Sequence, residues 1–273
     1  MKKFKNFYQT FIRSFFLQAY WNFAQMQNIG LLFIILPSLK RIYKGEKTLM
    51  RRALKRNMEV FNSHPVLSAY SVGAMIKQEE KIAVTPKQEM PEEERELRII
   101  RISTANTAAS IGDRLFWGTL KPLSLVFFIV ALFAGDVDAL KEGILKGEFL
   151  FPVVLALLGS LFVYNVPALV TRAKGLADSY NGTEEDFYGL INLNWNRVIY
   201  FLKTLGQIFT LFIIFYGLYI QFHDTAWDVD TITRLSLLPA FIILSIFMRK
   251  LNIPNIFLYI IATIVFGLAS FAA

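Results

Sequence analysis

Long segments without a single charged residue constrain what this chain can fold into more than any other feature. Residues 149–170 carry no charged side chain, and residues 253–273 form a second such segment. A helix needs about 20 apolar residues to cross a bilayer, so both segments are long enough to span one. Residues 205–222 form a third, slightly shorter segment. The sequence therefore predicts an all-α membrane protein.

Composition excludes several classes of functional site. Charged residues make up 18% of the chain and hydrophobic residues 55%, whereas soluble domains contain about 25% charged residues. Cysteine is absent and the histidines are two, His64 and His223, so no thiolate nucleophile and no multi-histidine metal site is available. No phosphate-binding loop or serine elbow occurs. We expect no catalytic residue, no metal and no cofactor.

Three shorter apolar segments are ambiguous. Residues 123–135 and 235–248 are uncharged but short, so they span a membrane only if their flanks are recruited. Otherwise they are half-membrane hairpin arms, which must be buried in protein because lipid cannot satisfy irregular backbone. Residues 29–36, closed by Pro37, favour an embedded hairpin arm. The fold class predicted is a polytopic all-α membrane protein with an N-terminal amphipathic helix, re-entrant helical hairpins and about three to five transmembrane helices.

The N-terminal helix is expected to be amphipathic. Its apolar residues recur at spacings of three and four and form one stripe, made of Phe4, Phe7, Tyr8, Phe11, Ile12 and Phe15. Two interpretations stay open. The stripe lies in the cytoplasmic membrane interface against lipid, or it packs on the surface of a partner.

Charge divides the chain into two regions. Residues 1–122 hold 20 of the 29 Lys and Arg and 10 of the 21 acidic residues, while residues 123–273 carry a net charge of −2. We expect 1–122 to be an amphipathic and re-entrant helical region with motif-bearing loops, and 123–273 to be transmembrane. Basic residues beside membrane segments stay in the cytoplasm, which predicts a cytoplasmic N-terminal region, a cytoplasmic loop at 171–204 and a chain end outside. No fold motif supports nucleic-acid binding.

The most polar stretch, residues 77–101, mixes glutamates with lysines and arginines. It is interpreted either as a solvated helical excursion into the cytoplasm or as a docking surface for a soluble partner.

A break in the helical pattern carries the first polar motif. Pro65 disfavours helical geometry at His64, between a basic helix at 48–60 and a second helix at 66–81. Transporters place substrate sites at helix breaks within the membrane. The amide of Asn62 both donates and accepts, which suits a sugar hydroxyl. Alternatively, Asn62 and Ser63 cap the next helix, and the two roles are compatible.

The second polar motif, at 112–119, combines an acid with an aromatic pair. The Asp113 carboxylate accepts hydrogen bonds from hydroxyls, and the indole of Trp117 covers the C–H face of a sugar ring. The alternative is structural, because Arg114 is adjacent and able to neutralise Asp113 in an ion pair.

Motifs in a fixed order carry a resemblance to a known family. The run at 16–30 (FLQAYWNFAQMQNIG) is similar to the opening signature of subunit IID of the mannose/fructose/sorbose-type phosphotransferase system (PTS), and 37–43 (PSLKRIY) fits its continuation. Residues 61–65 (FNSHP) resemble the family's FFNTHP segment, and 112–119 (GDRLFWGT) its GD-x-x-FWGT segment. Beyond residue 122 the resemblance rests mainly on hydrophobic pattern.

The resemblance implies a transport subunit in the bacterial plasma (inner) membrane. It would pair with a second subunit, IIC, in a trimer of heterodimers that conducts a hexose, while soluble IIAB passes phosphate from phosphoenolpyruvate to the sugar. IID itself carries no phosphorylated residue. The candidates for contact with the sugar or with IIC are the positions that match the polar motifs: Asn62, His64, Asp113 and Trp117.

The chain departs from the family pattern before the second motif. Where the family reads GPLAGIGDS, residues 106–114 read NTAASIGDR, so Asn106, Thr107 and Ser110 replace two glycines and a proline. Arg114 stands at a small or proline position. Loss of glycine is expected to reshape the pocket. An alternative function is therefore a membrane docking or regulatory scaffold that has lost sugar transport.

Overall fold

Helices make up all the regular structure that is described. The computed structural model describes residues 6–133 and 150–223. The N-terminal helices are α1 Phe7–Ser14, α2 Asn28–Ile42, α3 Lys47–Asn57, α4 Ser68–Val84 and α5 Met90–Gly112. The π-helix η1 Asp113–Leu120, α6 Lys121–Phe133, α8 Leu150–Asn181 and α9 Trp195–His223 follow. The chain divides into two compact units, Met1–Ile213 and Ile214–Ala273, and the contacts below lie within the first.

Three helices are long and apolar enough to cross a membrane: Met90–Leu132, Phe151–Asn181 and Trp195–Tyr219. They confirm the prediction of an all-α membrane protein. The short apolar segment at 123–135 does recruit its flank, because α5, η1 and α6 follow one another without a break. The predicted segments 235–248 and 253–273, and the chain end expected outside, lie beyond the described residues.

The predicted loop at 171–204 is partly wrong, because α8 continues to Asn181. Arg172 and Lys174 are therefore helical, and Arg172 is buried. The partner of its guanidinium is Ser14, which is too distant in sequence for the pairing to be predicted. Arg172 Nη1 donates to the backbone oxygen of Ser14 at 2.7 Å and to its hydroxyl at 3.2 Å. This contact joins the end of α1 to α8.

The sequence suggested that Pro37 closes its apolar segment. Helix α2 instead runs through Pro37 to Ile42. Proline has no N–H to donate, so the carbonyl four residues earlier, that of Phe33, loses its helical partner. Arg13 supplies the replacement, with Nη1 donating to the Phe33 oxygen at 2.9 Å. Its guanidinium also lies 4.4 Å from the centroid of the Phe33 ring. A side chain from α1 therefore allows α2 to continue.

The apolar stripe of α1 divides between the chain's own core and the surface. Phe7 and Phe11 pack against a core cluster that α2 and α4 supply, including Leu31 and Val72. Tyr8, in contrast, is 74% exposed. The packed half anchors α1 on α2, and the exposed half is free for lipid or a partner, so both interpretations of the stripe stay open.

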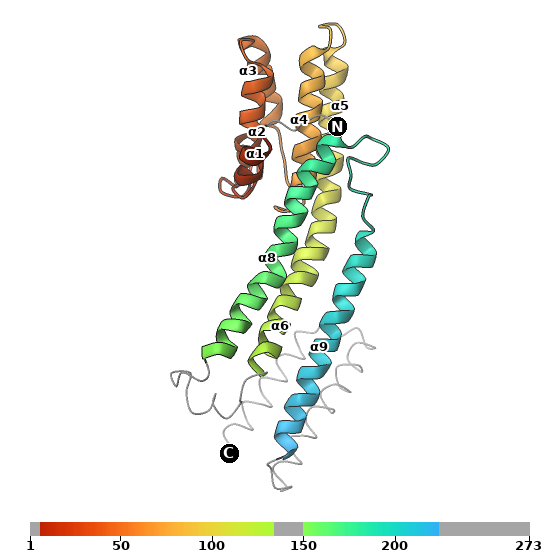
Figure 1. Cartoon of the computed structure of the whole chain (residues 1–273). Coiled ribbons are helices and arrows are strands. Elements are labelled where there is room, and N and C mark those ends of the chain that lie inside the picture. Colours follow the sequence, from red (N-terminus) through yellow and green to blue (C-terminus); the bar gives the residue numbers. More distant parts are fainter. Residues whose placement is uncertain (1–5, 134–149, 224–273) are drawn as a thin grey trace. The chain divides into compact units, whose positions relative to one another are not determined.

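The core that positions the rest of the unit lies where α4 packs against α8 and α5 (Figure 1). Close approach of α4 to α8 depends on Gly73, since a Cβ there would lie 2.0 Å from the hydroxyl oxygen of Ser179. The residues of α4 from Ser68 to Ile76 are all buried. Helix α4 is thus enclosed on all sides over its first half, which fixes the chain segment that precedes it.

The polar stretch at 77–101 is helical in its two arms, the end of α4 and the start of α5, with a turn at 85–89 between them, and it is not simply solvated. Glu79 is fully buried and pairs with Arg56 of α3, whose Nε donates to Oε1 at 2.9 Å. Tyr43 also donates to Glu79, from its hydroxyl to Oε2 at 2.7 Å. Burial and the adjacent carboxylate raise the pKa of Tyr43, so the hydroxyl keeps its proton. This network ties α3 to α4.

Glu79→Gln is expected to destabilise the protein by about 3 kcal/mol, because it removes the buried carboxylate of the pair and leaves the Arg56 guanidinium with only the more exposed Glu94 as counter-ion. The measurement is thermal unfolding of the purified protein in detergent. Glu92→Gln is the matched control. Glu92 is 75% exposed and pairs with Arg95 at 3.8 Å, so its loss should cost about 0–1 kcal/mol. Equal shifts in the two variants would contradict the prediction.

Candidate functional site

The second polar motif lies on a π-helix. From Asp113 to Leu120 the backbone adopts the wider π turn, in which hydrogen bonds join residues five apart. The hydroxyl of Thr119 follows the same spacing and donates to the oxygen of Arg114 at 2.7 Å. Segments of π-helix occur frequently at functional sites because they turn side chains out of the regular helical register. Trp117 is half-exposed on this segment.

The first polar motif is held as an irregular segment by a side chain and a backbone carbonyl from two other parts of the chain. The side-chain amide of Gln27 forms two hydrogen bonds with the backbone of Ser63. It donates to the carbonyl at 3.0 Å and accepts from the N–H at 2.9 Å. The Ser63 hydroxyl donates to the backbone oxygen of Ala105 at 3.0 Å. Neither Asn62 nor Ser63 caps α4, whose N-cap, Leu67, makes no side-chain bond. The capping interpretation is therefore wrong.

The two motifs meet at His64. The imidazole is 3% exposed and stacks on Phe116, with ring centroids 5.1 Å apart and planes 17° apart. It meets the Trp117 ring edge-on at 6.2 Å. Gly112 makes this possible, since a Cβ there would lie 2.3 Å from the Cβ of His64. Only glycine allows the histidine to lie against the end of α5.

His64 is neutral at physiological pH. It lies outside the three candidate spans, and burial, together with the positive charge of Arg172, lowers its pKa to about 4. Its Nδ1 accepts the backbone N–H of Val66 at 3.3 Å. The neutral ring therefore carries its proton on Nε2, which is buried and has no hydrogen-bond partner among the described residues.

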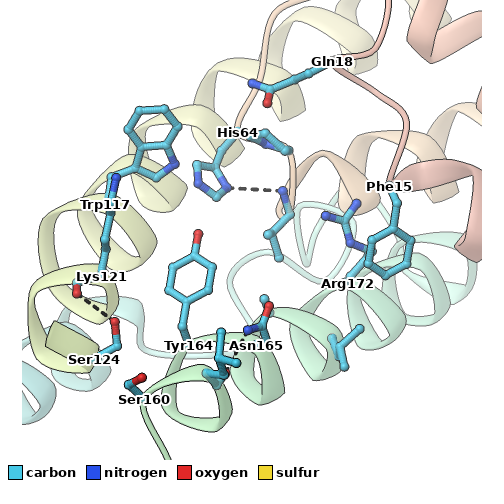
Figure 2. A pocket seen from close by; sticks show the side chains of 15 residues that line it. Phe15, Gln18, His64, Trp117, Lys121, Ser124, Ser160, Tyr164, Asn165 and Arg172 are labelled. Carbon is cyan, nitrogen blue, oxygen red and sulfur yellow. Dashed lines mark hydrogen bonds between the residues drawn. The ribbon is translucent and has the colours of Figure 1, made fainter. Parts of the chain in front are cut away.

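A cavity of about 550 Å³ opens beside His64 and Trp117. This lies within the range of about 300–1,000 Å³ typical of small-molecule sites. Its walls come from the segment after α1, the break before α4, η1, α6 and α8. Figure 2 shows the Tyr164 hydroxyl pointing from α8 toward His64 and Trp117. We call it the His64 cavity; its polar and aromatic lining comprises Phe15, Gln18, His64, Trp117, Lys121, Ser124, Ser160, Tyr164, Asn165 and Arg172.

The structure separates the four predicted site residues into two groups. His64 and Trp117 line the His64 cavity, whereas Asn62 and Asp113 are exposed and do not. Asn62 lines a different cavity of about 410 Å³, together with Asn106. The expected pair of Asp113 with Arg114 does not form. Arg114 instead donates to Asn196 Oδ1 at 3.0 Å.

Sequence reasoning missed the contribution of α8 to the cavity. Tyr164 and Arg172 are two turns apart on one side of this helix, and both line the cavity. Periodicity within 149–170 indicates only a span, and the charge pattern places Arg172 in a loop beyond it. The signal available was the i, i+4, i+8 spacing of Tyr164, Ala168 and Arg172, which places a polar edge on an otherwise apolar helix. Among the described residues, no group of three or more His, Asp or Glu could hold a metal.

Comparison with known proteins identifies a family. The chain matches the family described as the PTS system mannose/fructose/sorbose family IID component over residues 3–210. The mannose-specific EIID component of Escherichia coli strain K12 is 29% identical over 172 residues, which cover 63% of this chain and 53% of that protein. The fructose permease IID component of Bacillus subtilis strain 168 is 30% identical over 176 residues, which cover 64% and 56%. The matches thus span only about half the length of these relatives.

Two solved structures share the fold. One is a cryo-EM structure of the mannose transporter ManYZ in complex with microcin E492, with a TM-score of 0.52 and 21% identity over 100% of this chain and 97% of the other. The second, described as a membrane protein, has a TM-score of 0.64 and 22% identity over 99% of this chain and 97% of the other. At this level of identity the likeness concerns the fold alone.

Gly112→Ala is expected to displace His64 and to destabilise the protein by about 1–3 kcal/mol, because the new methyl group overlaps the imidazole. Thermal unfolding of the purified variant measures this. Gly217→Ala is the matched control, since no atom lies within 4 Å of its Cβ position. Equal thermal stability of the Gly112→Ala and Gly217→Ala variants would contradict the expected overlap with His64.

Proposed function

The chain belongs to the mannose/fructose/sorbose family of PTS IID components, and from that membership we propose that it is a sugar-translocating membrane subunit. It acts with IIC to bind and transport a hexose, which IIAB phosphorylates at the inner face. It supplies no catalytic residue of its own. We propose that it resides in the bacterial inner membrane, with the N-terminal region in the cytoplasm, as part of a trimer of IIC–IID heterodimers.

The observation that carries the proposal is the meeting of both polar motifs at one cavity. His64 presents a buried N–H donor, Trp117 a half-exposed aromatic face, and Tyr164 a hydroxyl directed between them (Figure 2). A sugar ring offers hydroxyls to the first and third and an apolar C–H face to the indole. The volume of the cavity suits a ligand of this size. We assign His64 and Trp117 to the sugar.

Asn62 and Asp113 are assigned to contact with IIC instead. Both are exposed, and neither borders the His64 cavity. Asp113 precedes Trp117 by four residues in the same helical run, so both side chains lie on one exposed side of it. A partner that covers this side would close the cavity mouth at Trp117 and pair with the Asp113 carboxylate.

Trp117→Leu is expected to lower sugar uptake about tenfold, equivalent to about 1.4 kcal/mol, because it removes the aromatic face from the cavity. Uptake of radiolabelled hexose is measured in cells that express this chain with IIC and IIAB. Trp21→Leu is the matched control. Trp21 is 47% exposed, against 56% for Trp117, and does not line the cavity.

Two outcomes would contradict this assignment. Equal uptake by the Trp117→Leu and Trp21→Leu variants would mean that the sugar does not bind in the His64 cavity. Absence of uptake by the unmodified chain, with its partners present and assembled, would favour the docking or regulatory scaffold.

Asp113→Lys is expected to reduce co-purification of IIC at least fivefold, because charge reversal at an interface costs several kcal/mol. Asn62→Ala should act in the same direction but more weakly. Glu92→Lys is the control for charge reversal at an exposed site away from η1. The measurement is recovery of tagged IIC with each variant after detergent extraction. Unchanged recovery with Asp113→Lys would place the IIC contact elsewhere.

A further inference from the structure

The His64 cavity is lined by positive charge without any negative charge. Arg172 and Lys121 both border it, and no Asp or Glu does. The side-chain acceptors in the lining, on Gln18, Ser124, Ser160, Tyr164 and Asn165, are all neutral amides or hydroxyls. The one carboxylate that the sequence offered as an acceptor, Asp113, lies outside the cavity. The lining thus favours a ligand that is rich in acceptors.

Arg172 is a buried cation whose partners within the described residues are all neutral. One of its nitrogens donates to the carbonyl and hydroxyl of Ser14, and its guanidinium lies 4.5 Å from the centroid of the Phe15 ring. The residue is 6% exposed. A buried charge is costly unless an opposite charge compensates it. The contrast with Arg56, which pairs with Glu79, shows how this chain neutralises a guanidinium elsewhere.

Lys121 places a second cation at the same cavity from a different helix. Its Nζ lies 5.9 Å from the centroid of the Trp117 ring, and it forms no ion pair within the described residues. The side chain is exposed and long enough to follow a ligand. The Nε2–H of His64, which has no hydrogen-bond partner among the described residues, adds a neutral donor to the same cavity.

We propose that the His64 cavity holds its ligand by an anionic group, a phosphate or a carboxylate, between Arg172 and Lys121. The fork of Arg172 fits such a group with paired hydrogen bonds, and Lys121 adds a point charge. The inference rests on the proposed function in taking this cavity as the ligand site. Two sources supply the same chemistry: an acidic or phosphorylated sugar, and the headgroup of an anionic phospholipid.

The test is direct binding to the full chain in nanodiscs of phosphatidylcholine. Glucose, mannose and galactose are each compared with their 6-phosphates and with the corresponding uronates, by calorimetry. We expect at least one anionic sugar to bind at least tenfold more tightly than its neutral parent. A second arm measures retention of phosphatidylglycerol against phosphatidylcholine by native mass spectrometry.

The variants distinguish the effect of Lys121 and Arg172 on anion binding from a general effect of positive charge on the protein. Lys121→Gln is expected to reduce the anion preference about tenfold. Because Lys121 is exposed and its side chain donates no hydrogen bond within the described residues, this variant should fold normally. Arg172→Gln should have at least as large an effect, although it also removes the bonds to Ser14. Lys174→Gln, at an exposed position two residues along α8, is the matched control and should change nothing.

Each outcome has one meaning. A sugar anion preference that Lys121→Gln removes supports the proposal with a soluble ligand. Selective phosphatidylglycerol retention that depends on Lys121 supports it with a lipid headgroup, and in that case the assignment of the sugar to this cavity fails while the anion site stands. Absence of anion preference in both arms, or a preference that Lys121→Gln and Lys174→Gln affect equally, overturns it.

Discussion

Compensation of buried charge within an apolar chain determines most of what is specific about this fold. The Arg56–Glu79 pair satisfies both members, since Tyr43 and Asn57 complete the hydrogen bonds of the carboxylate. Such a pair adds little net stability, because desolvation offsets much of the attraction, but removal of one partner is costly. It fixes α3 against α4 in one register. Arg172 is buried to a similar degree but has only neutral partners, which distinguishes the cavity from the structural network.

The cavity depends on irregular backbone that other segments stabilise. The helix break at His64 leaves backbone groups that α4 does not satisfy. The Gln27 amide satisfies both backbone groups of Ser63, and the Ser63 hydroxyl donates to the backbone oxygen of Ala105. A buried backbone group without a partner is costly, so a break of this kind depends on protein groups that satisfy it. Gly112 then allows the imidazole to reach the π-helix. The position of His64 is therefore set jointly by three segments that are distant in sequence.

The sequence was sufficient for the helical class and for the spans that contain residues 149–170 and 205–222, because uncharged runs of about 20 residues have few other solutions. It also placed His64 and Trp117 in the motifs that meet. It could not show that α2 passes through Pro37, because the carbonyl that proline frees is satisfied by Arg13 from another helix. Nor could it show the burial of Arg172 or the exposure of Asp113. Those facts depend on which helices pack against each other. Periodicity shows which residues share one side of a helix but not which helix packs against that side.

The departures from the family pattern lie outside the lining of the His64 cavity. Asn106, Ser110 and Arg114 follow one another at spacings of four and are all exposed, so they lie on one side of the α5–η1 run. None of them lines the His64 cavity, and Asn106 borders the separate cavity of Asn62. The glycine at the point of closest approach, Gly112, is retained. Larger polar residues on this side therefore alter the exposed surface of the α5–η1 run, while the packing that forms the cavity stays intact.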